Sequence, residues 1–287
     1  MSWLSTRMST YQMNYFLRSG VSRATVDLQR AGQELATGRR ADMFADLGPR
    51  AGVAITMRSR EESTQSYLEA NSVLEHKLDA MLLAIEAIRE PVQDVLQSAI
   101  VNQESAGAAS FAVQAEARSA LESVLSTLNN SFNGDYLFSG TSSNVRAVQR
   151  WDATNPDTGL SPEDVMASVL GTGPTDTASV AAMVAELDEV FFTGHSNANF
   201  DFEATFYNGT PEFDGLGNPN TRVSGRLDEG QQLVYGIQAN DDGFRQAIKG
   251  LAMLATFDIQ NITDEDAYTA WMEEAVQALS LGVQGTL

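Results

Sequence analysis

Apolar residues recur at intervals of three and four along the first 35 residues of the chain. One helical run comprises Leu4, Met8, Tyr11 and Tyr15, and after a slip the spacing resumes at Leu17, Val21, Ala24, Leu28, Ala31 and Leu35. A sustained period near 3.5 residues buries a narrow stripe against a partner helix, rather than a broad face against a globular core. Gly38, Gly48 and Pro49 then interrupt the pattern.

The large residues of this stripe are the candidates for an assembly interface. We call Leu17, Val21, Leu28 and Leu35 the N-terminal stripe, and Arg39 and Arg40 are its expected polar neighbours. The alternative is that these residues only stabilise the protein's own fold.

Two further helices follow with the same period. The first carries Tyr67, Leu74, Leu78, Met81, Ile85, Ile88, Val92, Val95 and Ala99, and the second carries Ala117, Leu121, Val124 and Leu128. Pro91 is expected either to kink the first of them or to mark a junction between two segments. The short break near Gly107 predicts that the two helices are antiparallel.

The composition and the hydrophobic pattern change between Val145 and about Gln238. Segments rich in Gly, Pro, Thr and Asp predict loops at "DATNPDTGLSPED" and "LGTGPTDTAS". Aromatic residues alternate with polar ones in "NFDFEATFYNGTPEFDGLGNPN", a pattern that predicts a strand. "TRVSGRL" and "QQLVYGIQA", separated by Asp228-Glu229-Gly230, predict a β-hairpin.

Helical spacing returns near the end of the chain. Phe244, Ile248, Leu251 and Leu254 mark one helix, and a second opens near Thr263 with three acidic residues in its first turn. The predicted fold is therefore mainly α with a β-containing insert. We expect a coiled-coil arm at 1–44, a helical rod at 45–145 and 239–287, and an inserted β-containing outer domain at 146–238.

Charge is distributed unevenly along the chain. The net charge is −20, but residues 1–60 carry nine arginines against four acids and are net positive. This asymmetry indicates an N-terminal arm with a different role from the body, although a solvated basic helix face is the alternative. An acidic surface repels phosphate backbones, so no nucleic-acid partner is expected.

Candidate chemistry is sparse. The chain has no cysteine, which excludes thiol catalysis, disulfides and cysteine-ligated zinc. His76 and His195 have no local motif for a general base, so a surface role is expected for both. The glycines of "GTGPTDT" lack the lysine of a phosphate-binding loop, and "FDGLGNPN" lacks the glutamate of an EF-hand. We therefore expect no catalytic residue, no metal and no cofactor.

No targeting segment is evident in the sequence. The first 20 residues have no continuous apolar core, and no run approaches the roughly 20 apolar residues that span a bilayer. Neither a cleaved signal peptide nor a membrane partner is expected.

Several segments resemble one known family. "LSTR", "LQRAGQELATGRR" (Leu28–Arg40) and Met57-Arg58-Ser59-Arg60 are similar to the N-terminal region of the flagellin superfamily. "FNG" (Phe132–Gly134) is shared with flagellins, whereas "DYLFSGT" (Asp135–Thr141), "FYNGTPEFDG" and "VYGIQANDDGFRQAI" resemble the flagellar hook–filament junction proteins of that superfamily. The resemblance covers about 1–145 and 205–280.

The resemblance implies an elongated, flagellin-like rod of long antiparallel coiled-coil helices plus an outer domain. It implies a structural adaptor, outside the cell in the bacterial flagellum and exported by the flagellar type III system. Its partners would be the hook-side junction protein, flagellin and further copies of itself in a ring. A flagellin, the repeating filament subunit, is the alternative, and a surface enzyme or glycan-binding module using Phe191–Asn220 is a third hypothesis.

In this family a long C-terminal helix pairs with the N-terminal arm. The sequence ends at Leu287 without that helix, so either it is a piece of a longer chain or this member lacks the helix. An export chaperone would bind the same C-terminal region, so this expected partner is in doubt. We expect Met1 to about Arg40 to be disordered in isolation or to pair with another chain, because a narrow helix is marginal alone in water.

Overall fold

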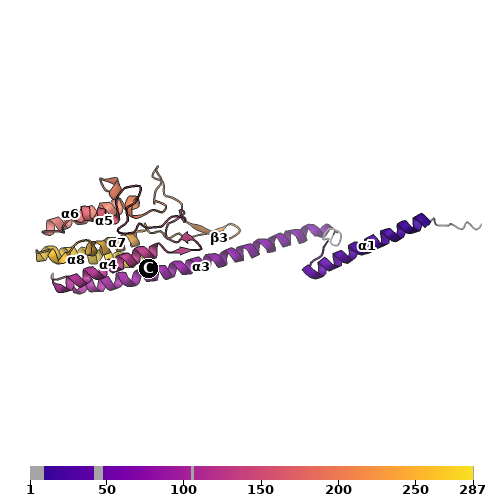
Figure 1. Cartoon of the computed structure of the whole chain (residues 1–287), viewed down its shortest axis with the longest axis horizontal. Helices are drawn as coiled ribbons and strands as arrows, with labels where there is room; N and C mark the ends of the chain where they lie inside the picture. The colour runs from indigo at the N-terminus through magenta and orange to yellow at the C-terminus, as the bar shows by residue number, and fades with distance from the viewer. Residues whose placement is uncertain (1–9, 42–47, 105–106, 287) are drawn as a thin grey trace, which may run out of the picture. The chain divides into compact units, whose positions relative to one another are not determined.

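The computed structural model describes residues 10–41, 48–104 and 107–286 (Figure 1). This part of the chain is mainly helical with a small β-containing portion, which confirms the predicted fold class. Two compact units are present, Met1–Ser66 and Tyr67–Leu287. The three-part division into arm, rod and outer domain stays a prediction.

The elements are numbered in chain order. The α-helices are α1 (Thr10–Thr37), α3 (Ala51–Val101), α4 (Ala108–Leu128), α5 (Pro162–Leu170), α6 (Thr177–Asp188), α7 (Asp242–Ala255) and α8 (Glu265–Gly285). The strands are β1 (Ser131–Phe132), β2 (Asp135–Tyr136), β3 (Ser224–Asp228) and β4 (Gln231–Val234). Short 3-10 turns lie at η1 (Gly48–Arg50), η3 (Ala198–Phe200) and η5 (Ile259–Asn261), and π-helical turns at η2 (Glu189–Thr193) and η4 (Phe202–Phe206).

The first unit contains α1 and the beginning of α3. One helix spans Thr10–Thr37 in spite of the slip in the apolar spacing, and none of its residues is buried. It ends as predicted near Gly38, whose N–H donates to the Glu34 carbonyl at 2.8 Å. Leu4 and Met8 lie outside the described residues.

Helix α3 runs without interruption through Pro91, so the predicted alternative of a junction between two segments is wrong. Ile88 and Val92 on either side of the proline are fully buried. This packing offsets the backbone hydrogen bond that proline cannot make. The predicted apolar positions of α3 from Met81 to Ala99 and those of α4 from Ala117 to Leu128 all lie in the core.

Helices α3, α4, α7 and α8 form an antiparallel bundle in the second unit. The Tyr268 hydroxyl near the start of α8 contacts the Asn102 carbonyl after α3 and the Ser110 hydroxyl of α4, both at 2.9 Å. At the other end of α8, Arg89 of α3 donates to the Thr286 carbonyl at 3.0 Å. Gln114 of α4 donates to the Phe257 carbonyl after α7, and Figure 1 shows α4, α7 and α8 running side by side.

Helices α7 and α8 approach each other more closely than ordinary side chains allow. A Cβ atom built on Gly282 would lie 2.7 Å from the backbone nitrogen of Ala247, and one on Gly243 would lie 2.6 Å from the backbone of Gly285. Further along, a Cβ on Gly250 would lie 2.8 Å from Leu279. Glycines at these positions let the two backbones pack almost in contact.

A tight hairpin leads the chain out of the bundle after α4. Asn133 and Gly134 both have positive φ, 53° and 93°, as a two-residue turn with the right-handed strand twist requires. The following residues, Leu137 and Phe138, are buried, and the Phe138 carbonyl accepts a 2.9 Å hydrogen bond from the N–H of Ala239. The segment that leaves the bundle therefore lies beside the one that re-enters it at α7.

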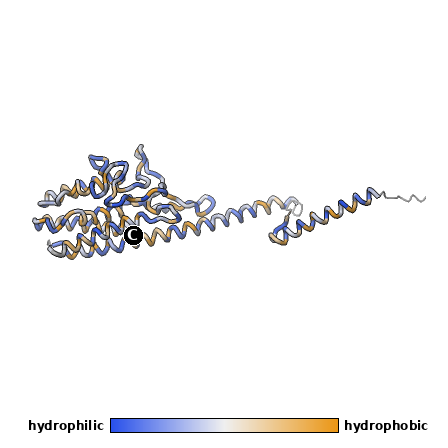
Figure 2. The backbone as a smooth tube through the Cα atoms, viewed as in Figure 1, coloured by the Kyte–Doolittle hydropathy of each residue, from blue (hydrophilic) through white to orange (hydrophobic). Residues whose placement is uncertain are grey.

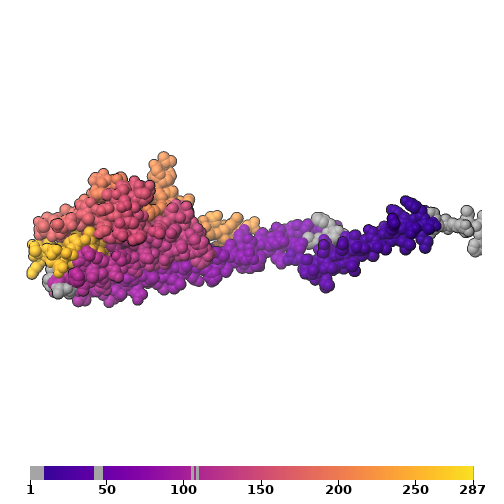
Figure 3. All heavy atoms as spheres, in the orientation of Figure 1, coloured from indigo at the N-terminus to yellow at the C-terminus, as the bar shows by residue number. Residues whose placement is uncertain are grey.

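The insert differs from its prediction in two places. The predicted loops are loops at 152–161 and 171–176, but helix α5 begins within the last three residues of the first and helix α6 within the last three of the second. The predicted strand at "NFDFEATFYN" is the 3-10 turn η3 followed by the π-helical turn η4. Phe202 and Phe206, four residues apart, stack at 5.5 Å and both contact Phe191, so aromatic clustering rather than strand pairing sets the backbone here. In Figure 3 the insert covers much of the helices on the side in view.

The predicted hairpin of the insert is confirmed. Strands β3 and β4 pair antiparallel through the turn at Glu229-Gly230, with an irregularity between Arg226 and Asp228. The hairpin packs on α3, where the Asn71 amide donates to the Leu227 carbonyl at 3.0 Å.

Two buried cations of α7 hold the aromatic part of the insert. The Arg245 guanidinium forms an ion pair with Glu203 of η4 at 3.1 Å and donates to the carbonyls of Phe191 and Asn240. Lys249, one helical turn later, pairs with Asp188 at the end of α6. The side chains of Arg245 and Lys249 are only 7% and 6% exposed, whereas Glu203 and Asp188 are 27% and 49% exposed, so two ion pairs with buried cations join the insert to the bundle.

Candidate functional site

The N-terminal stripe is uncovered along its whole length. The exposed fractions are 60% for Leu17, 67% for Val21, 75% for Leu28 and 89% for Leu35. In Figure 2, apolar and polar residues alternate along α1. Four large apolar side chains along one side of a helix are seldom all exposed in this way. A contiguous apolar surface of this kind is typical of an interaction site.

The polar neighbours of the stripe make weak ion pairs at the surface. Arg39 lies 3.9 Å from Glu61 and Arg40 lies 3.7 Å from Glu34, with both arginines more than half exposed. Glu34 also accepts a hydrogen bond from the N–H of Ala41 at 3.0 Å. Exposed pairs at this distance contribute little to stability. The role of Arg39 and Arg40 in assembly stays a prediction.

The exposure of α1 leads to a hydrogen-exchange prediction. Because none of its residues is buried, only local helix hydrogen bonds slow the exchange of its amides. In a verified monomer, the amides of Leu17–Leu35 are expected to exchange far faster than those of the buried α8, measured by mass spectrometry. Equal protection of both helices would contradict the absence of a covering partner.

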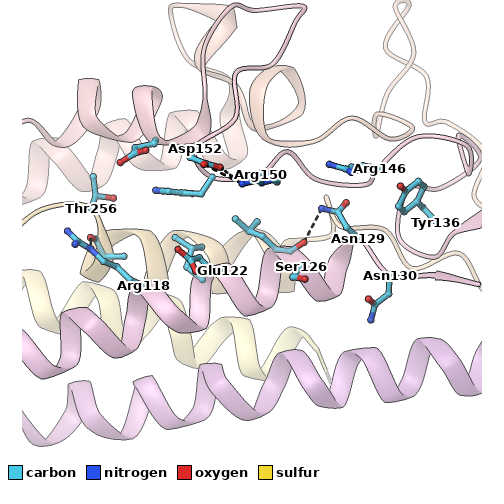
Figure 4. Close-up of a pocket in the computed structure, with 15 residues that line it drawn as sticks. Arg118, Glu122, Ser126, Asn129, Asn130, Tyr136, Arg146, Arg150, Asp152 and Thr256 are labelled. Carbon is cyan, nitrogen blue, oxygen red and sulfur yellow. Dashed lines mark hydrogen bonds and ion pairs between the residues drawn. The ribbon is translucent and has the colours of Figure 1, made fainter.

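A second candidate site is a groove of about 810 Å³ in the second unit. Figure 4 shows Glu122, Ser126 and Asn129 on α4, facing Arg146, Arg150 and Asp152 on the segment that enters the insert. Glu163 of α5 and Thr256 after α7 complete its wall.

The groove is polar but balanced in charge. Three arginines and three acids line it, Arg118, Arg146 and Arg150 against Glu122, Asp152 and Glu163. Several of its polar groups already hold the walls together: Arg118 donates to the Ala255 carbonyl at 2.7 Å, and Asn129 exchanges two hydrogen bonds with the backbone of Val148. Because the positive and negative side chains are balanced, the groove does not attract an anion. Its lining residues also do not place a nucleophile beside a base. Sequence reasoning missed the groove because its walls come from four distant segments.

The two histidines have different surroundings. His76 is exposed, as expected. The expected surface position of His195 is wrong, because its side chain is only 9% exposed and its ring stacks on Phe200 at 5.0 Å. Its Nδ1 accepts from the N–H of Asn197, and its Nε2 lies 3.4 Å from a Glu186 carboxylate oxygen. These contacts fold the loop after η2 back on itself.

The loop at Asp214 is satisfied by its own backbone. The Asp214 carboxylate accepts hydrogen bonds from the N–H groups of Asn218 and Leu216, both at 2.8 Å, and these bonds hold its pKa below the ordinary value. Within 10–41, 48–104 and 107–286, no three His, Cys, Asp or Glu residues are grouped so that they could hold a metal ion. A search of the same residues finds no helix with the length and hydropathy of a membrane span.

These observations define a class of protein before any comparison. Long antiparallel helices together with an exposed apolar stripe on α1 are typical of a helical structural protein. Residues 8–143 match the family model described as the bacterial flagellin N-terminal helical region. The match supports membership of the flagellin superfamily and a structural role in the flagellum, outside the cell. No curated protein and no solved structure matches the chain.

Proposed function

We propose that the protein is a structural adaptor that joins the hook side of the bacterial flagellum to the flagellin filament. The observation that carries the proposal is the N-terminal stripe, since four large apolar side chains are between 60% and 89% exposed within a flagellin-type N-terminal region. Such a stripe associates with another helix once the chain is assembled.

A geometric mechanism follows from this stripe. Copies of one helical surface can contact unlike neighbours if each neighbour presents a matching stripe, so an adaptor can connect the hook-side junction protein to flagellin. Ring formation by further copies, and export by the flagellar type III system, belong to the same proposal. Its support is the family match together with the "DYLFSGT" resemblance at Asp135–Thr141.

A filament subunit is the second candidate function. The family match itself favours it, because the matching model describes flagellins. Against it stands the segment after β2, where Leu137, Phe138 and Ser139 are buried at the junction of bundle and insert and resemble the junction-protein version.

Immunogold electron microscopy of intact flagella separates the two functions. The antibody is raised against residues 146–204, in the insert. A single band at the boundary between hook and filament is the expected result. Label along the whole filament would refute the adaptor function and support the filament-subunit function. Absence of label from flagella would refute both functions.

A further inference from the structure

The second unit contains two Asn-Gly dipeptides with nearly the same local sequence. Asn133-Gly134 lies in "FNG", and Asn208-Gly209 lies in "FYNGTPEFDG". An asparagine before glycine is prone to lose its side-chain amide, because the glycine nitrogen can reach the side-chain carbonyl carbon without hindrance from a Cβ atom. The two sites offer the same chemistry, so their surroundings decide which of them reacts.

Asn133 lies at the exposed tip of the hairpin formed by β1 and β2. Its φ is 53° and that of Gly134 is 93°, and a Cβ atom built on Gly134 would meet no atom within 4 Å. Within the described residues, neither the Asn133 side chain nor the Gly134 N–H has a hydrogen-bond partner. Each strand of the hairpin has only two residues, so opening of the turn costs little. The side-chain amide and the attacking nitrogen are therefore free to approach each other.

Asn208 is held by contacts that the hairpin tip lacks. Its side chain donates to the Gln149 side-chain oxygen at 3.2 Å and accepts from the Asn155 side-chain amide at 3.1 Å. A Cβ atom built on Gly209 would lie 2.5 Å from the carbonyl oxygen of Ser139, so the glycine is enclosed as well. Attack at this site requires several of these contacts to break at the same time.

We propose that Asn133 is a site of spontaneous deamidation and that Asn208 is protected from it. The Gly134 nitrogen, after losing its proton to hydroxide, bonds to the Asn133 Cγ, and the bond between Cγ and Nδ2 breaks. The leaving nitrogen takes a proton from water and departs as ammonia, which leaves a cyclic imide. Water then opens the imide at one of its two carbonyl carbons and yields either aspartate or isoaspartate. The reaction uses only the chain and water.

The products change a recess beside the hairpin. This recess of about 310 Å³ is lined by Asn133 and Asp135, by Lys77 of α3 and by Arg226 of β3. Both products add a carboxylate beside these two basic side chains, which favour it electrostatically. Isoaspartate also adds an atom to the backbone, so the two-residue turn cannot keep its geometry. We therefore expect isoaspartate, rather than aspartate, to loosen the hairpin.

Peptide mapping of the aged full-length protein tests the proposal. The folded protein is incubated at neutral pH, and fragment mass spectrometry follows asparagine, aspartate and isoaspartate at both sites, with a zero-time sample to subtract conversion during digestion. Asn133 is expected to convert at least about tenfold faster than Asn208. In urea the two rates are expected to converge, because both asparagines are followed by glycine. Equal rates in the folded protein, faster conversion of Asn208, or no conversion of Asn133 would each overturn the proposal.

The variant Asn133→Gln assigns the reaction to its residue. The longer side chain forms the cyclic intermediate much more slowly, so conversion in this peptide is expected to disappear. Conversion that persists in the variant would place the reaction at a neighbouring asparagine and overturn the proposal.

The variant Asn133→Asp separates the two products, because it carries the new charge without the extra backbone atom. The Leu137 N–H donates to the Asn130 carbonyl at 3.0 Å, next to the hairpin. Its hydrogen exchange is expected to rise in the aged protein and to stay unchanged in Asn133→Asp. An equal rise in both proteins would refute the effect assigned to isoaspartate. All these measurements use the purified chain, so their outcome is independent of the adaptor function.

Discussion

The Gly282→Val variant is expected to lose about 3 kcal/mol of the free energy of unfolding. The nearest atoms to a new Cβ are the backbone nitrogen and Cα of Ala247, at 2.7 and 2.8 Å. Backbone atoms cannot rotate away as a flexible side chain can, so α7 and α8 must separate. Equilibrium unfolding in urea, followed by circular dichroism, measures the loss.

The control for this variant is Gly32→Val in α1. A Cβ at Gly32 meets no atom within 4 Å, so only helix propensity changes there, by well under 1 kcal/mol. Equal stability of the two variants would show that α7 and α8 do not pack as closely as the glycines indicate.

The Arg245→Met variant is expected to lose a further large amount of stability, about 3 kcal/mol in the same measurement. Methionine preserves most of the apolar stem but removes the charge that pairs with Glu203 and Glu212. It also leaves the buried carbonyls of Phe191 and Asn240 without their donor. Hydrogen exchange should rise first in η2 and η4, which the guanidinium holds against α7.

Arg150→Met is the matched control for this second variant. Arg150 pairs with Asp152 at 3.2 Å, nearly the distance of the Arg245 pair, but both partners are more than 60% exposed. Its loss is expected to stay below about 1 kcal/mol. A comparable loss at both positions would mean that desolvation does not govern the strength of the Arg245 contact.

The helices of the bundle could be predicted because their apolar residues recur at intervals of three and four. The apolar positions predicted for α4, Ala117, Leu121, Val124 and Leu128, are all buried, and so are Phe244, Ile248, Leu251 and Leu254 of α7. The start of α8 was also predictable, since Asp264 accepts a hydrogen bond from the N–H of Ala267 as an N-cap. At Pro91 the periodicity predicted the helix correctly, and the expectation of a break was wrong because the buried Ile88 and Val92 keep α3 continuous.

The insert was harder to predict because tertiary contacts set its backbone. Alternating aromatics predicted a strand at 199–207, yet clustering with Phe191 turns this segment into a helix. Helix α5 did have a local signal in "SPED": Ser161 and Asp164 form a reciprocal cap, and Pro162 occupies the first turn. The N-terminal stripe was found from spacing alone, but spacing cannot identify its partner.

The antiparallel bundle has a consequence for the order in which the chain can fold. The contacts that join α3 and α4 to α8 connect residues 166 and 197 positions apart, in the pairs Asn102–Tyr268 and Arg89–Thr286. Such distant pairing makes folding slow, because a long loop must close before the contacts form. A chain that emerges N-terminus first from a ribosome or a narrow conduit therefore cannot complete its core until α8 is free.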